Sequence, residues 1–129
     1  MIPAIATLFT VLNAGEVDAS LDRFAWSHRP ILVFAGAEDD PRLAAQLDAL
    51  RAAALELAER DNVVIVDRGG DSALARRFRP NGFTVILVGK DGGEKLRRTE
   101  VTPPQDLNDL IDTMPMRRRE MREDGQTRP

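Results

Sequence analysis

Three short, continuous apolar runs stand out along the chain, and each is bounded by polar or glycine-rich residues. They are ILVFA at 31–35, VVIV at 63–66 and TVILV at 84–88. A run of this length without polar alternation is typical of a strand buried on both faces of a sheet. The segment 94–99 alternates polar and apolar residues, which predicts a fourth strand with one exposed face.

Helical periodicity fills the intervals between these runs. Apolar residues recur at helical spacing over 41–59, so we expect a single helix there. Asp40 is a good N-cap for it, and Pro41 suits its first position. A short helix is predicted to begin near 71–72, and a last helix to lie within 103–114.

The element order is therefore β-α-β-α-β-β-α. The runs 31–35 and 63–66 should be parallel and adjacent, because right-handed crossovers join them. GKDGG at 89–93 should form a hairpin, with a type I′ turn at Asp91-Gly92. It lacks the spacing and the following helix of a phosphate-binding loop. This order predicts a thioredoxin-like α/β fold, a three-layer sandwich around a mixed four-stranded sheet.

Chain length and composition limit the organisation and the chemistry. A length of 129 residues indicates one domain, placed at 21–122 between an extension at 1–20 and a frayed tail at 123–129. The chain has no cysteine and one histidine, which excludes thiol redox catalysis, a Ser-His-Asp triad and a multi-histidine metal site. Two of its 18 basic residues are lysines, Lys90 and Lys95, and the net charge is -3. No affinity for nucleic acid is expected from that charge.

Acidic residues occupy the position at which thioredoxins carry their redox cysteines, directly after the first core strand. These residues are Glu38, Asp39 and Asp40. They could favour the dipole of the following helix. They could also bind a hard cation, joined by Asp67 or Asp91. The helix interpretation is favoured, so no metal or cofactor is expected.

Three strings support a resemblance to a known family: FAWSHRPILVFA at 24–35, ILVGKDGGEKLR at 86–97 and IDTMPMRRREM at 111–121. Together they resemble the P-DUDES family, a domain of unknown function found in many bacterial proteins and in sushi-repeat-containing extracellular proteins. The resemblance implies a thioredoxin- or peroxiredoxin-like fold that generally lacks the redox cysteines. It favours a periplasmic or secreted location over a cytoplasmic one, and it brings no established activity.

The string DTMPMRRREM at 112–121 predicts a bend, because proline cannot continue a regular helix. We expect the bend at 114–116, with Met114 or Met121 packed on the domain. Three successive arginines span about 300° of a helix, so at least one must turn inward and meet a carboxylate or backbone carbonyls, with an aspartate favoured. Candidate partners are Asp67, Asp91 and Asp112.

The sequence also predicts the location of two aromatic residues and two possible roles for the N-terminal segment. Phe24 and Trp26 are predicted to lie in the core. The apolar segment 1–14 is either a signal-peptide remnant or an element that packs on the domain, and it is too short to span a membrane.

Two functions are compatible with the sequence. The first is a non-catalytic binding or interaction module for an unknown protein or a small anionic ligand. The alternative is an enzyme or anion-binding protein that uses Asp40, Asp91 and Arg117. A pocket in which these charges converge would favour the alternative, whereas dispersed charges would favour the module. The candidate surface residues are Glu38, Asp39, Asp40, Lys90, Asp91, Arg117, Arg118 and Arg119.

Overall fold

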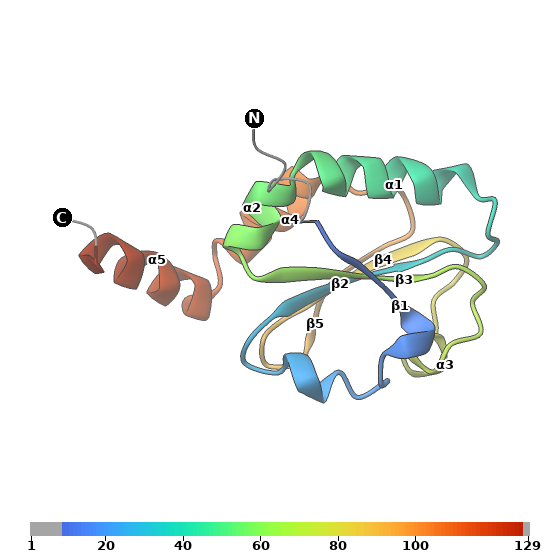
Figure 1. Cartoon of the computed structure of the whole chain (residues 1–129), viewed down its shortest axis with the longest axis horizontal. Helices are drawn as coiled ribbons and strands as arrows, with labels where there is room; N and C mark the ends of the chain where they lie inside the picture. The colour runs from blue at the N-terminus through green and yellow to red at the C-terminus, as the bar shows by residue number, and fades with distance from the viewer. Residues whose placement is uncertain (1–8, 128–129) are drawn as a thin grey trace.

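The computed structural model describes residues 9–127 and places their strands in one mixed sheet (Figure 1). The strands are β1 (Val11–Asn13), β2 (Arg29–Phe34), β3 (Asn62–Asp67), β4 (Thr84–Val88) and β5 (Glu94–Arg98). The α-helices are α1 (Pro41–Ala52), α2 (Ala54–Glu59), α3 (Ala73–Phe78), α4 (Pro104–Ile111) and α5 (Pro115–Thr127). Short 3₁₀ helices form η2 (Ala14–Glu16) and η3 (Asp22–Phe24).

The strand order is β1-β3-β2-β4-β5. β3 is parallel to both β1 and β2, whereas β4 is antiparallel to β2 and to β5. The predicted neighbours and directions of the three buried runs are therefore confirmed, as is the hairpin to the fourth strand. The predicted number of strands was wrong, because β1 adds a fifth strand at the edge beside β3.

β1 is only three residues long, which is too short for a periodicity to identify. Its residues Val11 and Leu12 pair with Val64 and Ile65 of β3. The predicted signal remnant at 1–14 falls partly outside the described residues, since these begin at residue 9.

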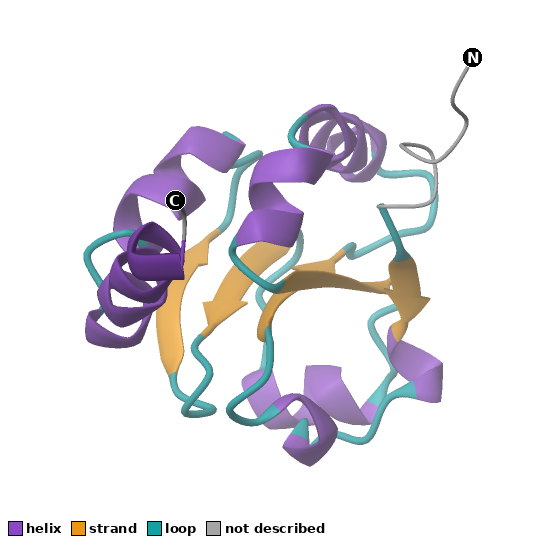
Figure 2. Cartoon of the chain, turned by 60° about the vertical axis from the view of Figure 1, so that its left-hand side comes forward, coloured by secondary structure: helices purple, strands orange, loops and turns teal. Residues whose placement is uncertain are grey.

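Helices cover both faces of the sheet, so the domain has three layers (Figure 2). Alternate residues of the central strands enter two separate cores. Ile31 and Val33 pack with the leucines of α1, α2 and α4, whereas Leu32 and Phe34 pack with η2, η3 and α3. Because both faces of β2 are buried, its sequence shows no alternation of polar and apolar residues.

The prediction of one helix over 41–59 was wrong. α1 ends at Ala52, and α2 begins at Ala54 after a tightened turn at Ala53, whose N–H donates to the Leu50 carbonyl over 3.0 Å. Leu50 and Leu57 are both buried on the same face of the sheet despite the break. No glycine or proline marks the turn, so the sequence pattern gave no warning of it.

The hairpin between β4 and β5 has a different turn from the predicted one. Among its central residues, Gly92 has positive φ (86°) and Asp91 does not, which excludes a type I′ turn. Gly92 N–H donates to Gly89 O, and Gly89 N–H donates to Gly93 O. This is a type I turn followed by a left-handed glycine, the usual three-residue hairpin loop.

The bend predicted at 114–116 is confirmed, because α4 ends at Ile111 and α5 begins at Pro115. Met114 packs against the core, and α5 then extends away from the sheet (Figure 1). Helix α5 continues through 123–127, where a frayed tail was expected. Its Met, Arg and Glu residues are good helix formers.

A buried glutamine connects α1 to the loop before α4. Gln46 is fully buried, and its side-chain amide donates to Thr102 O over 2.9 Å and accepts from Thr102 N over 2.7 Å. The side-chain amide thus pairs with both backbone groups of Thr102, as a neighbouring strand would do in a sheet. Without it, both backbone groups of Thr102 would be buried and unpaired.

We therefore expect Gln46→Ala to lower the free energy of unfolding by about 3 kcal/mol, through the cavity and the two unpaired groups. Urea denaturation followed by circular dichroism would measure it. The matched control is Gln105→Ala, at an exposed position of α4, which should change stability by less than about 0.5 kcal/mol. Equal effects of the two changes would contradict the role assigned to Gln46.

Candidate functional site

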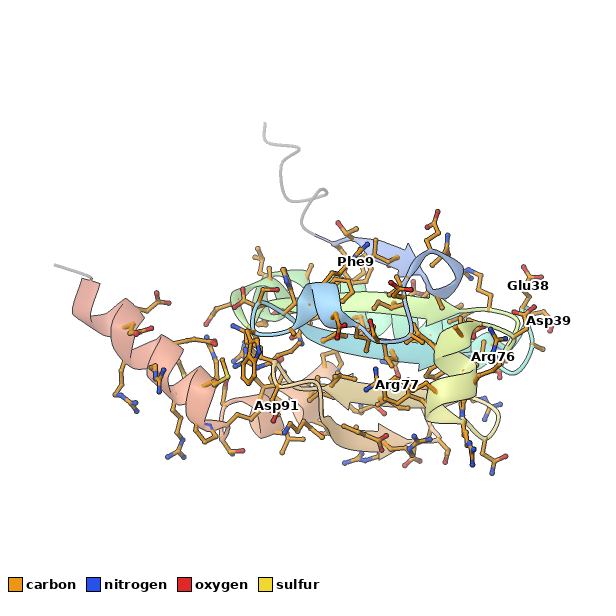
Figure 3. All side chains as sticks on the ribbon, turned by 90° about the horizontal axis from the view of Figure 1, so that it is seen from below. Phe9, Glu38, Asp39, Arg76, Arg77 and Asp91 are labelled. Atoms are coloured by element: carbon orange, nitrogen blue, oxygen red, sulfur yellow. The ribbon has the colours of Figure 1, made fainter. Side chains whose placement is uncertain are left out.

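The predicted surface residues lie at the two opposite ends of the central strands, and we call each end an edge of the sheet. Glu38, Asp39 and Asp40 follow the carboxyl end of β2. Because β4 runs antiparallel to β2, its carboxyl end and the turn with Lys90 and Asp91 lie at the other edge. Figure 3 shows Glu38 and Asp39 at one end of the molecule and Asp91 far from them.

The acidic edge is explained by helix capping. The Asp40 carboxylate accepts from Arg42 N and binds the Arg42 guanidinium over 2.8 Å. The side-chain hydrogen bond from Arg42, followed by the one from its backbone N–H, holds the pKa of Asp40 below its ordinary value. Glu38 and Asp39 are exposed, and no group of three acidic or histidine residues within 9–124 is placed to hold a metal ion.

The opposite edge carries a partly buried network of charges. It joins the start of β2, the end of α2 and the loop that follows it, the hairpin turn, the α4–α5 junction and the first turns of α5. Four positive and four negative side chains take part, so their charges balance. We call this set the ionic cluster, and it comprises Arg29, Glu59, Arg60, Asp61, Lys90, Asp112, Arg117 and Glu120.

One half of the ionic cluster surrounds Arg29, which is 1% exposed. Its guanidinium donates to the Arg60 carbonyl and to both carboxylate oxygens of Glu120. Lys90 Nζ binds the same Glu120 carboxylate over 2.7 Å and Asp61 Oδ2 over 2.8 Å. A single glutamate of α5 therefore binds two buried cations, one from β2 and one from the hairpin turn, and Asp61 supplies the second negative charge.

The other half surrounds Arg117, the inward arginine of the three. It is 3% exposed and contacts Asp112 at 3.2 Å and Glu59 at 3.1 Å, whereas Arg118 and Arg119 are exposed. The prediction of one inward arginine with an aspartate partner is thus confirmed for Asp112. Asp67 and Asp91, the other proposed partners, bind elsewhere.

The cations of the cluster lower the pKa of two carboxyls. Hydrogen bonds from Arg60 and then from Arg117 hold the pKa of Asp112 below its ordinary value, against the effect of burial. Burial by itself raises the pKa of Glu120, but hydrogen bonds from Lys90 and Arg29 outweigh it, so this pKa is also lowered. Both carboxylates are therefore ionised near neutral pH.

A hollow of about 400 Å³ lies beside the ionic cluster, within the range of small-molecule sites. Most of its exposed lining is apolar and comes from the segment before β2, the hairpin and the junction of α4 with α5. We call it the Trp26 cavity. Its lining residues are Trp26, Arg29, Gly89, Lys90, Asp91, Lys95, Leu110, Met114, Pro115 and Met116.

Trp26 is the exception to the predicted core, because its side chain is 65% exposed whereas Phe24 is buried. Its φ of 66° is strained for a bulky residue. The backbone is held there by a 2.7 Å hydrogen bond from Trp26 N–H to Lys90 O. This bond ties the Trp26 segment to the hairpin turn and places the indole at the cavity.

Lys95 also depends on the hairpin for its position. Its Nζ binds Asp91 Oδ2 over 2.9 Å, and its stem crosses Gly89 so closely that a Cβ there would lie 2.5 Å from Lys95 Cε. Any larger residue at position 89 would therefore displace the lysine. Both lysines of the chain, Lys90 and Lys95, line the cavity.

The structure does not bring the three residues of the enzyme hypothesis together. Asp40 caps α1, Asp91 lies at the opposite edge in the hairpin, and Arg117 is enclosed by carboxylates. Lys90 and Asp91 are the predicted surface residues that line the Trp26 cavity.

Sequence reasoning missed Trp26, Arg29 and Glu120. A signal existed for Glu120, since it lies three residues after Arg117 and shares its helix face. For Arg29 the signal was its position directly ahead of an apolar run, which indicates that its charge is buried at the start of a core strand and needs a partner.

Comparison with solved structures defines the fold class. A yeast mitochondrial 1-Cys peroxiredoxin superimposes with a TM-score of 0.60 at 16% identity, over 81% of this chain and 96% of that one. A mutant thioredoxin from Halobacterium salinarum gives 0.61 at 19% identity, over 80% and 88%. Chloroplastic thioredoxin z gives 0.58 at 21% identity, over 80% and 92%. The protein is a thioredoxin-like domain, and at these identities the likeness shows the fold alone.

The sequence comparison then assigns the family. Residues 20–120 match the model of a domain of unknown function, DUF4174, and the chain belongs to that family. No curated protein matches the sequence. Within 9–127 no helix combines the length and the apolar character needed to cross a bilayer.

Because Arg117 is buried and Arg119 is exposed, the two should respond differently to the same change. Arg117→Ala should lower the free energy of unfolding by about 2 kcal/mol. This is below the usual figure for a broken buried pair, since Asp112 keeps Arg60 and Glu59 reaches solvent. Arg119→Ala should change it by less than about 0.5 kcal/mol. Equal melting temperatures for the two variants would refute the structural role of Arg117.

The lowered pKa values of Asp112 and Glu120 also predict a pH dependence. Each carboxyl binds its proton more weakly in the folded state, so its stabilisation is complete above about pH 4.5 and disappears as pH falls through the folded pKa. Unfolding free energies between about pH 5 and 2 should therefore fall less steeply in the Asp112→Asn/Glu120→Gln variant than in the wild type. Parallel curves would show that these carboxyls do not couple folding to pH.

Proposed function

We propose that this domain is a non-catalytic thioredoxin-like binding module whose ligand site is the Trp26 cavity. The observation that carries the proposal is Trp26 itself. A bulky residue held at positive φ costs about 1–2 kcal/mol, and strain of this kind concentrates at functional sites. In this strained conformation the large indole of Trp26 lies in solvent at the cavity. The side chain is not part of the hydrophobic core.

Two further observations support the proposal. The edge that holds the redox site in thioredoxins carries acidic residues, and the chain has no cysteine for thiol–disulfide exchange. The charges named for an enzyme are dispersed, and each is paired within its own element or cluster. The resemblance to the P-DUDES family favours an exported module, which fits a binding role outside the cytoplasm.

The test uses a neutral apolar dye, N-phenyl-1-naphthylamine. Trp26 is the one tryptophan of the chain, and tyrosine is absent, so energy transfer from protein to dye reports proximity to the cavity. We expect saturable binding of one dye per chain with strong transfer from Trp26. Met116→Glu should abolish it, because a charge would enter the apolar lining.

The matched control is Ala44→Glu, which adds the same charge at an exposed position of α1 near the acidic edge. Melting temperatures of both variants establish that they fold. Dye binding that survives Met116→Glu, or that is lost equally in Ala44→Glu, would overturn the assignment of the site.

A further inference from the structure

We propose that the Trp26 cavity accepts an amphipathic monocarboxylate, an unbranched acyl chain that ends in one carboxylate, with the chain among the methionines and the carboxylate at Lys90 and Lys95. This inference rests on the proposed function of the same site. It goes further by naming the chemical class of the ligand.

The polar part of the lining is predominantly cationic. Arg29, Lys90 and Lys95 line the cavity together with one carboxylate, Asp91, which is bound to Lys95. Asp61 and Glu120, which neutralise Lys90 and Arg29, are not among the lining residues. A ligand in the cavity would therefore lie beside the cations of the network, and of the carboxylates that bind them only Asp91 is among the lining residues.

Both lysines retain hydrogen-bonding capacity. An ammonium group has three N–H donors. Lys90 directs two of them to Asp61 and Glu120, and Lys95 directs one to Asp91. The remaining donors have no acceptor within the described part of the chain, and a carboxylate can accept from both lysines with strong, charge-assisted bonds.

The first turn of α5 adds to this preference. Pro115 and Met116 open that helix and line the cavity, so the positive end of its dipole lies there. That turn contains no acidic residue to neutralise it. The helix end would not make a site by itself, but it acts in the same direction as the lysines.

The balance of the ionic cluster argues for a single negative charge on the ligand. Each lining cation already has a carboxylate partner, so the site supplies hydrogen-bond donors rather than a large net charge. A carboxylate satisfies these donors, whereas a phosphate dianion would need additional cations. The ligand head is therefore a carboxylate.

The apolar lining indicates the rest of the ligand. Met114 and Met116 are flexible and adapt to an irregular or mobile chain. Leu110, Pro115 and the indole of Trp26 complete this surface. A volume of about 400 Å³ accommodates an acyl chain of medium length.

The experiment compares decanoate with decanol, which share the chain and differ in the charge. Binding to the full chain is followed by the fluorescence of Trp26, which should shift to shorter wavelength as the ligand excludes water. We expect decanoate to bind about tenfold or more tightly than decanol, the factor typical of a charge-assisted hydrogen bond. Lys95→Gln should remove this advantage and leave the affinity for decanol unchanged.

Arg98→Gln is the matched control. It removes one positive charge from the same strand at a residue that does not line the cavity. It should leave the affinity for decanoate within about twofold, since exposed charges at a distance are screened. An equal loss in both variants would show that net charge, and not contact with Lys95, attracts the ligand.

The outcomes separate this inference from the proposed function. If the neutral dye binds but decanoate and decanol bind equally, the ligand class is wrong and the cavity serves an uncharged apolar group, such as a side chain of a partner protein. If neither the dye nor decanoate binds, both proposals are wrong. A decanoate affinity that is unchanged in Lys95→Gln also overturns the carboxylate assignment.

Discussion

The burial of Arg29 is the constraint on which the rest of this structure depends. Its guanidinium lies at the start of a central strand with 1% of the residue exposed, and an unpaired charge there would cost several kcal/mol. Its carboxylate partner, Glu120, lies 91 residues further along the chain, on a helix that otherwise extends away from the domain. This ion pair ties the first turns of α5 to the start of β2.

The same requirement organises the candidate site. Glu120 also binds Lys90, whose carbonyl accepts from Trp26 N–H, so the hairpin and the Trp26 segment are connected to α5 through one residue. The α4–α5 bend then brings Met114 and Met116 into the lining of the same cavity as Trp26. The cavity is thus formed where three distant segments meet around a balanced set of charges.

The two ends of the central strands carry different groups of residues. The edge after β2, where the fold places redox cysteines, carries a helix cap formed by Asp40 and Arg42. The opposite edge carries buried charges, a strained tryptophan and an apolar cavity. The proposed site therefore lies at the end of the sheet opposite to the one that a thioredoxin uses, which is compatible with a shared fold because function depends on the site and not on the fold.

The sequence by itself determined the three buried strands and their hairpin partner, the cap at Asp40 and the inward turn of one arginine. These follow from local rules: apolar runs, capping chemistry, and the angle between successive helical residues. Strand β1 and the exposure of Trp26 were decided by tertiary structure alone. The reason is physical, since β1 depends on pairing with β3 and Trp26 on a hydrogen bond to Lys90, and both partners lie far away in the chain. The break at Ala53 is a local turn, but no glycine or proline in the sequence marks it. The pairing of Arg29 with Glu120 and the cavity beside it belong to this second group, because no local pattern encodes a contact over 91 residues.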